Sequence, residues 1–230
     1  MGEISNKVDP IELSNLAAKT YGSMKQSLIA GKFLPGERLR IRELATLFGT
    51  SATPVREALL RLISEHALEL QAAKQIAVPD LSTARYIEIR TIRLALEPLA
   101  VELAVPRLQP ADVETLTRLQ EEFVVAEERG DVEEEMRTNR AFHLGLYTHA
   151  ALPMLQATIE NLWASMGPIL KAWYLTGMSD YQGATEHENV LRCLRQRDAV
   201  GAARAMQNDI LVPGPSILRF LETAEVKHAA

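Results

Sequence analysis

Residues 34–59 read LPGERLRIRELATLFGTSATPVREAL, and this stretch decides the fold of the first third of the chain. It opens on a Pro-Gly turn signal. A short helix is then predicted from Ile41 to Phe48, where Gly49 ends it, and a second amphipathic helix follows with Pro54 in its first turn. Two helices joined by a tight turn that contains glycine are typical of a helix-turn-helix.

The sequence on either side of this stretch completes a larger unit. The apolar spacing predicts a helix over about residues 14–30, and residues 68–79 alternate weakly between apolar and polar, which indicates a two-stranded hairpin. The resulting order is helix, helix, turn, helix, hairpin, which is the layout of a winged helix-turn-helix. A small helical subdomain without a ligand is the alternative that the pattern leaves open.

From Leu81 onward the apolar periodicity is helical throughout. Helices are predicted over about residues 82–105, 110–129, 131–150, 153–176, 184–197 and 198–211, with a loop at 177–183. The short connections predict antiparallel neighbours and therefore a helical bundle. The Pro-Gly-Pro at 213–215 is expected to end the pattern. We therefore predict two domains, a winged helix-turn-helix head over residues 1–80 and an all-helical domain over residues 81–230.

Composition narrows the class of protein. The chain has 230 residues, a net charge of −5 and 47% hydrophobic residues, as expected of a globular protein. Residues 1–80 hold 10 Lys/Arg and 9 Asp/Glu, whereas residues 81–230 hold 15 and 21. The single cysteine, Cys193, excludes an internal disulfide and a Cys-rich zinc finger, and favours a cytoplasmic location. No apolar run approaches the roughly 18 residues that span a bilayer, so no membrane is expected.

Four polar side chains fall on apolar helix stripes of the second domain. Asn139 and His143 lie one turn apart on one stripe, and His187 and Asp209 lie on the stripes of two later helices. Burying such groups without partners is costly. A divalent ion such as Zn²⁺, Ni²⁺, Mn²⁺ or Fe²⁺, held by two imidazoles, a carboxylate and an amide oxygen, would satisfy all of them. A hydrogen-bonded core network is the alternative.

Arg93 lies beside the apolar stripe of the first bundle helix. It could bind a ligand carboxylate through two parallel hydrogen bonds. The other reading is a surface ion pair with Glu97, four residues further along the same helix. The case for an enzyme is thin, because the sequence has no Gly-rich phosphate loop, no Gly-x-Ser-x-Gly and no His-Glu-x-x-His.

The PGERL, REL-A and TPVREAL pieces of residues 35–59, at their mutual spacing, resemble the DNA-binding head of GntR-family bacterial regulators. The rest of the chain resembles the FCD effector domain of the FadR-like branch. The pieces that carry this second resemblance are RLALEP at 93–98, NRAFH at 139–143, Glu186-His187 and Arg197-Asp198. Together the two resemblances cover nearly the whole chain.

The resemblance implies a mainly α protein, with a winged helix-turn-helix followed by an antiparallel FCD-type bundle. It also implies a homodimer that binds a palindromic double-stranded operator, a divalent metal (Zn, Ni or Mn), and a small organic acid bound at or near the metal beside Arg93. The family's DNA contacts map onto Arg42, Ser51, Thr53 and Arg56, with Lys74 at the wing tip.

Several positions depart from the family pattern. Asp209 replaces the usual third histidine of the metal set, and Ala52 stands where the recognition helix often carries an arginine. Lys74-Gln75 replaces a usual Arg-Gly at the wing, and His66 replaces a glycine before it. The expected function is a metabolite-responsive regulator and not an enzyme. The rivals are a helical-bundle metalloenzyme and a metal-stabilised DNA-binding protein without an effector.

Overall fold

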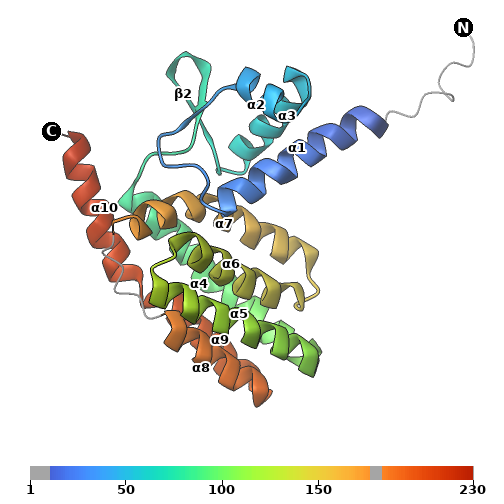
Figure 1. The fold of residues 1–230 in the computed structure, drawn as a ribbon, viewed down its shortest axis with the longest axis vertical. Coiled ribbons are helices and arrows are strands. Elements are labelled where there is room, and N and C mark those ends of the chain that lie inside the picture. The colour runs from blue at the N-terminus through green and yellow to red at the C-terminus, as the bar shows by residue number, and fades with distance from the viewer. Residues whose placement is uncertain (1–10, 177–182, 230) are drawn as a thin grey trace, which may run out of the picture.

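A computed structural model describes residues 11–176 and 183–229, and it confirms the predicted fold class. The head comes first and the helical bundle follows it (Figure 1). The expected loop at 177–183 falls almost wholly outside the described residues. The head consists of α1 (Ile11–Ile29), β1 (Arg38–Leu39), α2 (Ile41–Leu47), α3 (Ala52–Ser64), β2 (Glu69–Gln71) and β3 (Gln75–Ala77).

The wing is a three-stranded antiparallel sheet in the order β1-β3-β2, whereas the sequence predicted two strands. Leu39 pairs with Ile76, which in turn pairs with Leu70. His66, just before the wing, adopts φ 60. This left-handed conformation favours glycine, so His66 holds a turn at which glycine would be less strained.

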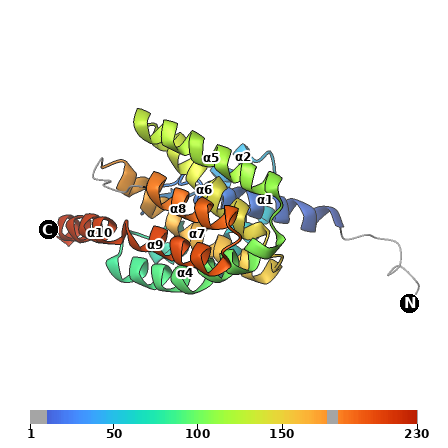
Figure 2. The same cartoon turned by 90° about the horizontal axis from the view of Figure 1, so that it is seen from below.

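Seven α-helices and one short 3-10 helix, Val105–Arg107, form the second part of the described chain, and the bundle helices run back and forth as the short connections predict (Figure 2). Asp131 and Asp198 cap two of them by accepting a hydrogen bond from the backbone N–H three residues on. The helices are α4 (Thr83–Ala104), α5 (Pro110–Arg129), α6 (Val132–Thr148), α7 (Pro153–Tyr174), α8 (Gly183–Arg195), α9 (Ala199–Leu211) and α10 (Gly214–Ala229).

Helix α10 corrects the prediction that the helical pattern ends at residue 213. It begins at Gly214, so Pro215 falls in its first turn, where a proline costs no hydrogen bond. Ile217, Phe220 and Leu221 are buried and pack with Tyr86 and Trp173 of the bundle. The same Pro-Gly-Pro that looked like a terminator therefore starts another helix.

The head sits on the bundle mainly through α1 and α7. A Cβ placed on Gly167 of α7 would lie 2.1 Å from the carbonyl oxygen of Leu28, so only glycine permits this approach of the two backbones. Lys25 of α1 also lies 3.8 Å from Glu160 of α7. A second connection runs through α4, whose Arg85 donates to the carbonyl of His66 at the end of α3.

Candidate functional site

The residues proposed to contact DNA lie on one exposed face of the head. Arg42 is on α2, Arg56 is in the second turn of α3 and Lys74 is at the wing tip, and all three line a surface hollow of about 640 Å³. Ser51 and Thr53 are also exposed, at the start of α3. The Ser51 side chain makes no capping hydrogen bond to α3, so capping does not occupy its hydroxyl.

Two further cations on this face escaped the sequence analysis. Arg38 and Arg40 flank the buried Leu39 of β1 and line the same hollow. Arg40 also pairs with Glu43 at 2.8 Å, and Glu43 is the single acidic residue in the lining. The available signal was the density of positive charge, because three arginines fall within residues 38–42.

The four polar residues on the apolar stripes meet in the middle of the bundle. His143 Nε2 lies 3.2 Å from His187 Nε2 and 3.2 Å from Asp209 Oδ2, and the ligand atoms of the three residues all lie within 4.8 Å of one another. They come from α6, α8 and α9. Separations of 44 and 22 residues along the chain are thus closed by antiparallel packing.

The side chains of this cluster are buried, and burial acts on the pKa of His187. His143, His187 and Asp209 are 1%, 0% and 4% exposed. Burial lowers the pKa of His187 to about 3, with a further lowering by His143 and an opposing effect of Asp209, so its imidazole is neutral at pH 7. Asn139 Oδ1 is buried and has no hydrogen-bond partner among the described residues. An unsatisfied buried acceptor in the wall of a cavity that also holds an imidazole and a carboxylate fits a cation.

Each histidine is held on its other ring nitrogen. His143 Nδ1 lies 3.0 Å from the Tyr147 hydroxyl, and His187 Nδ1 lies 2.7 Å from Gln120 Oε1. The Tyr147 hydroxyl donates to Glu97 at 2.6 Å. Burial, together with Glu97, raises the pKa of Tyr147 well above its usual value, so the hydroxyl keeps its proton. Tyr147 follows Asn139 and His143 at a spacing of four, a signal that the sequence analysis did not use.

Arg93 and Glu97 form the predicted i,i+4 pair, but in the interior and not on the surface. Arg93 Nε lies 2.6 Å from Glu97 Oε1, and the two side chains are 9% and 0% exposed. A second hydrogen bond of 3.2 Å joins the guanidinium to Oε2, and Trp163 Nε1 donates to Oε1 at 3.0 Å. Burial by itself lowers the pKa of Arg93, but Glu97 outweighs it and the net pKa is raised.

A small cavity of about 40 Å³ lies against the cluster. Asn139, His143 and Asp209 form one side of it, and Arg90 and Arg93 of α4 add positive charge. Its volume is close to that of one water molecule. Apolar and aromatic side chains from α4, α7, α9 and α10, with Pro213 between the last two helices, complete the wall: Tyr86, Trp163, Met166, Leu170, Trp173, Tyr174, Ile210, Pro213 and Ile217.

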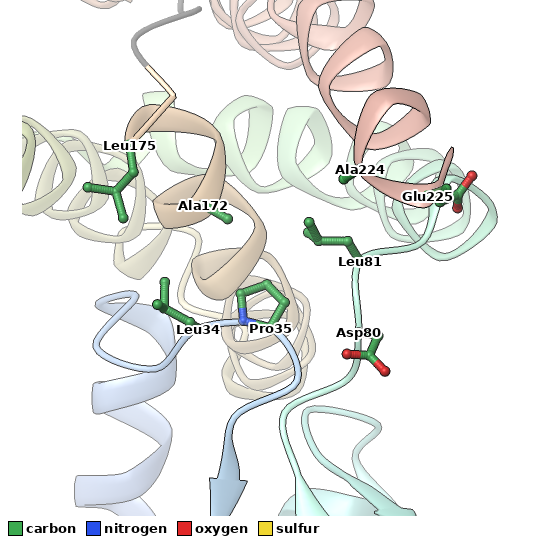
Figure 3. Close-up of a pocket in the computed structure, with 8 residues that line it drawn as sticks. All are labelled: Leu34, Pro35, Asp80, Leu81, Ala172, Leu175, Ala224 and Glu225. Atoms are coloured by element: carbon green, nitrogen blue, oxygen red, sulfur yellow. The ribbon is translucent and has the colours of Figure 1, made fainter. Parts of the chain in front are cut away.

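A larger hollow of about 580 Å³ lies elsewhere, where the head, the segment before α4, the end of α7 and α10 meet (Figure 3). Its polar lining is limited to the carboxylates of Asp80 and Glu225, and Glu225 already accepts a hydrogen bond from the backbone N–H of Thr83. It contains none of the histidines. This hollow is far larger than the 40 Å³ cavity, but the convergent polar side chains line the smaller cavity.

Comparison with known proteins adds the family context. Residues 16–78 match the gntR family of bacterial regulatory proteins, and residues 88–211 match the FCD domain. The HTH-type transcriptional regulator McbR of Escherichia coli K12 is 38% identical over 206 residues, which are 86% of this chain and 92% of McbR. The HTH-type transcriptional repressor GlaR of the same organism is 27% identical over 86% of this chain and 93% of its own length.

Solved structures give the same picture. The structure of E. coli McbR/YncC superposes with a TM-score of 0.79 at 34% identity, covering 89% of this chain and 97% of that one. A GntR regulator from Rhodococcus sp. RHA1 superposes with a TM-score of 0.70 over 88% of this chain and 97% of its own, but at 16% identity it supports the fold alone. Among the described residues no helix is long and apolar enough to cross a membrane.

Proposed function

Because the chain belongs to the GntR family of bacterial transcriptional regulators, in the FadR-like branch that carries an FCD domain, we propose that a small organic acid bound beside a metal controls its operator binding. The family membership identifies a transcriptional regulator and not a metalloenzyme. The head, proposed to end near residue 80, would bind DNA, and the domain from residue 81 would bind the effector.

The DNA-binding part of the proposal is supported by the exposed basic face of the head. Arg42, Arg56 and Lys74 line one hollow, and Arg38 and Arg40 extend its positive charge. Arginine and lysine on such a face bind phosphates and guanine edges. Ser51 and Thr53 stand at the start of α3, where short hydroxyl side chains reach the DNA backbone or bases. One recognition helix reads one half-site, so a palindromic operator calls for a homodimer.

The observation that carries the effector proposal is the cavity whose wall includes Asn139, His143 and Asp209. Asn139, His143, His187 and Asp209 would hold a divalent ion, because they offer two imidazole nitrogens, a carboxylate and an unsatisfied amide oxygen. Two nitrogens and two oxygens suit Zn²⁺, Ni²⁺ or Mn²⁺. The bound ion would supply positive charge at the cavity wall, and Arg90 and Arg93 would add to it. An organic carboxylate is the ligand that such a surface attracts.

The test is operator binding by the full chain at fixed Zn²⁺, with and without a series of two- to six-carbon carboxylic acids. The operator is a double-stranded sequence selected in vitro for binding. We expect at least one acid to change the operator affinity, and its corresponding amide to have no effect. Equal affinity with and without every acid would leave a metal-stabilised DNA-binding protein without an effector. No bound DNA at any salt concentration would contradict the proposal as a whole.

A further inference from the structure

We propose that Tyr147 and Gln120 are positioning residues that fix the protons of the two cluster histidines. Both rings would carry their proton on Nδ1, so that both Nε2 lone pairs face the same buried point. This inference rests on the proposed metal site. It explains how residues of the chain orient the two histidines before an ion binds. It gives roles to two buried side chains that do not themselves approach the ion.

The hydrogen bonds of the Tyr147 hydroxyl determine which ring nitrogen of His143 carries the proton. A phenolic hydroxyl has one proton to donate, and Glu97 Oε2 is 2.6 Å from it. Arg93 donates a hydrogen bond to each oxygen of Glu97, so Glu97 acts as an acceptor in this ion pair. The hydroxyl is also 3.2 Å from Met206 Sδ, but a carboxylate is a far stronger acceptor than a thioether. The hydroxyl therefore donates to Glu97 and accepts from His143, 3.0 Å away, which requires a proton on His143 Nδ1.

The hydrogen bonds of the Gln120 amide determine in the same way which ring nitrogen of His187 carries the proton. Gln120 Nε2 donates to the carbonyl oxygen of Ala184 at 2.8 Å, and a carbonyl cannot accept from the amide oxygen. This fixes the amide orientation and turns Oε1 toward His187 Nδ1, 2.7 Å away. An amide oxygen only accepts, so His187 must donate from Nδ1. Phe142 stacks on the His187 ring at 4.3 Å and holds its plane.

The consequence is an arrangement that suits an added cation better than a closed hydrogen-bonded network. The two Nε2 atoms face each other at 3.2 Å, and Asp209 Oδ2 is another 3.2 Å from His143 Nε2. If both protons are on Nδ1, these three atoms are all acceptors. A cation at this point would interact favourably with each of them, whereas without one they repel each other.

The two outer partners, Tyr147 and Gln120, connect the histidines to different surroundings. His143 connects through Tyr147 to the Glu97–Arg93 pair of α4, while His187 connects to a neutral amide on α5. Outer partners of this kind raise the basicity of a ligating imidazole and hold its direction, and their loss weakens metal binding about 10–100-fold. In this arrangement Arg93 and Glu97 stabilise the site through Tyr147 and do not themselves bind the ion.

The experiment uses the full chain, labelled with ¹⁵N-histidine and loaded with Zn²⁺. Long-range ¹H–¹⁵N correlation spectra report which nitrogen of each ring carries a proton. We expect protonated Nδ1 and zinc-bound Nε2 for both His143 and His187. Competition with a chromophoric chelator measures the Zn²⁺ affinity of the same samples.

Variants separate positioning from packing. Tyr147→Phe and Gln120→Leu should each weaken Zn²⁺ binding about 10–100-fold, and each should remove the slowly exchanging Nδ1–H of its own histidine only. Gln120→Glu, which restores an acceptor, should recover that proton signal and most of the affinity. Tyr21→Phe is the matched control, because the Tyr21 hydroxyl also donates to a glutamate, Glu65 at 2.6 Å, but lies in the head, and this variant should leave Zn²⁺ affinity nearly unchanged.

A proton on Nε2 of either ring, or zinc on Nδ1, would overturn the inference while leaving the metal proposal intact. An unchanged Nδ1–H signal and affinity in both Tyr147→Phe and Gln120→Leu would overturn it too. If the wild-type chain binds no Zn²⁺, Ni²⁺ or Mn²⁺, the metal proposal fails, and the spectra of the metal-free protein still decide the proton positions. If Tyr147→Phe does not fold, the two Gln120 variants carry the test.

Discussion

Replacing Arg93 with methionine separates two roles that this residue could have. Arg93→Met keeps most of the side-chain volume but removes the two hydrogen bonds to Glu97, at 2.6 and 3.2 Å. Glu97 is 0% exposed, so its carboxylate would stay buried without a counter-charge. Breaking a buried ion pair by removing one partner costs about 3–5 kcal/mol. Each kcal/mol shifts the melting temperature of a chain of this size by about 2–4 °C, so we expect a fall of roughly 6–20 °C.

The assay is differential scanning calorimetry on the effector-free protein, with circular dichroism to confirm that helix content is retained. The double variant Arg93→Met/Glu97→Gln removes the buried charge but keeps an oxygen that accepts from Trp163. It should recover much of the loss, with a coupling energy of about 2–3 kcal/mol between the two sites. A melting temperature for Arg93→Met within 2 °C of wild type would refute this reasoning. Arg93 would then serve the effector alone, and its loss should abolish only the effector response.

Three further outcomes are expected. Arg56→Ala should weaken operator binding by about 1–3 kcal/mol in a fluorescence-anisotropy titration, while Arg118→Ala on α5 should not; wild-type affinity in a folded Arg56→Ala protein contradicts the assignment. His187→Ala should lose the metal in elemental analysis, whereas His149→Ala should keep it, and equal metal content in both excludes His187 as a ligand. Burial raises the pKa of Glu135 to about 7, so the native state binds its proton more tightly than the unfolded chain. Stability should therefore fall as pH rises from about 4.5 to 7, and urea titrations should show a flatter profile for Glu135→Gln; identical profiles would contradict the buried carboxyl.

Local signals determined how much of the fold the sequence could predict. Helix positions followed from apolar spacing, and Asp131 and Asp198 marked two starts because a side chain can cap only the helix it begins. The two-residue strand β1 escaped because two residues cannot show an alternating pattern. Helix α10 escaped because a proline in a first turn and a proline after a helix look the same without the packing of Ile217 and its neighbours.

The cluster histidines could be predicted because stripe spacing places each side chain on the inner face of its helix. The same spacing of four points to Tyr147 as a partner, but Gln120 could not be predicted in this way. Gln120 is separated by 67 residues from His187, and nothing local to either of them indicates the contact. The Arg93–Glu97 pair was predicted from its spacing, but whether a pair at this spacing is solvated or buried depends on the neighbouring helices. Here α6 and α7 cover it with Tyr147 and Trp163.

The size of the cavity bears on how an effector could reach the DNA-binding head. A cavity of about 40 Å³ holds a water molecule, but not an organic acid of several heavy atoms, so such a ligand would have to displace part of the wall. Helix α7 contributes Trp163 and Met166 to that wall, and its next residue, Gly167, supports α1 of the head through the close approach to Leu28. Because packed helices move as units, a shift of α7 that admits a ligand also moves the surface on which the head rests. A ligand that prefers one of these positions would then bias the placement of the recognition helix by its difference in affinity between the two.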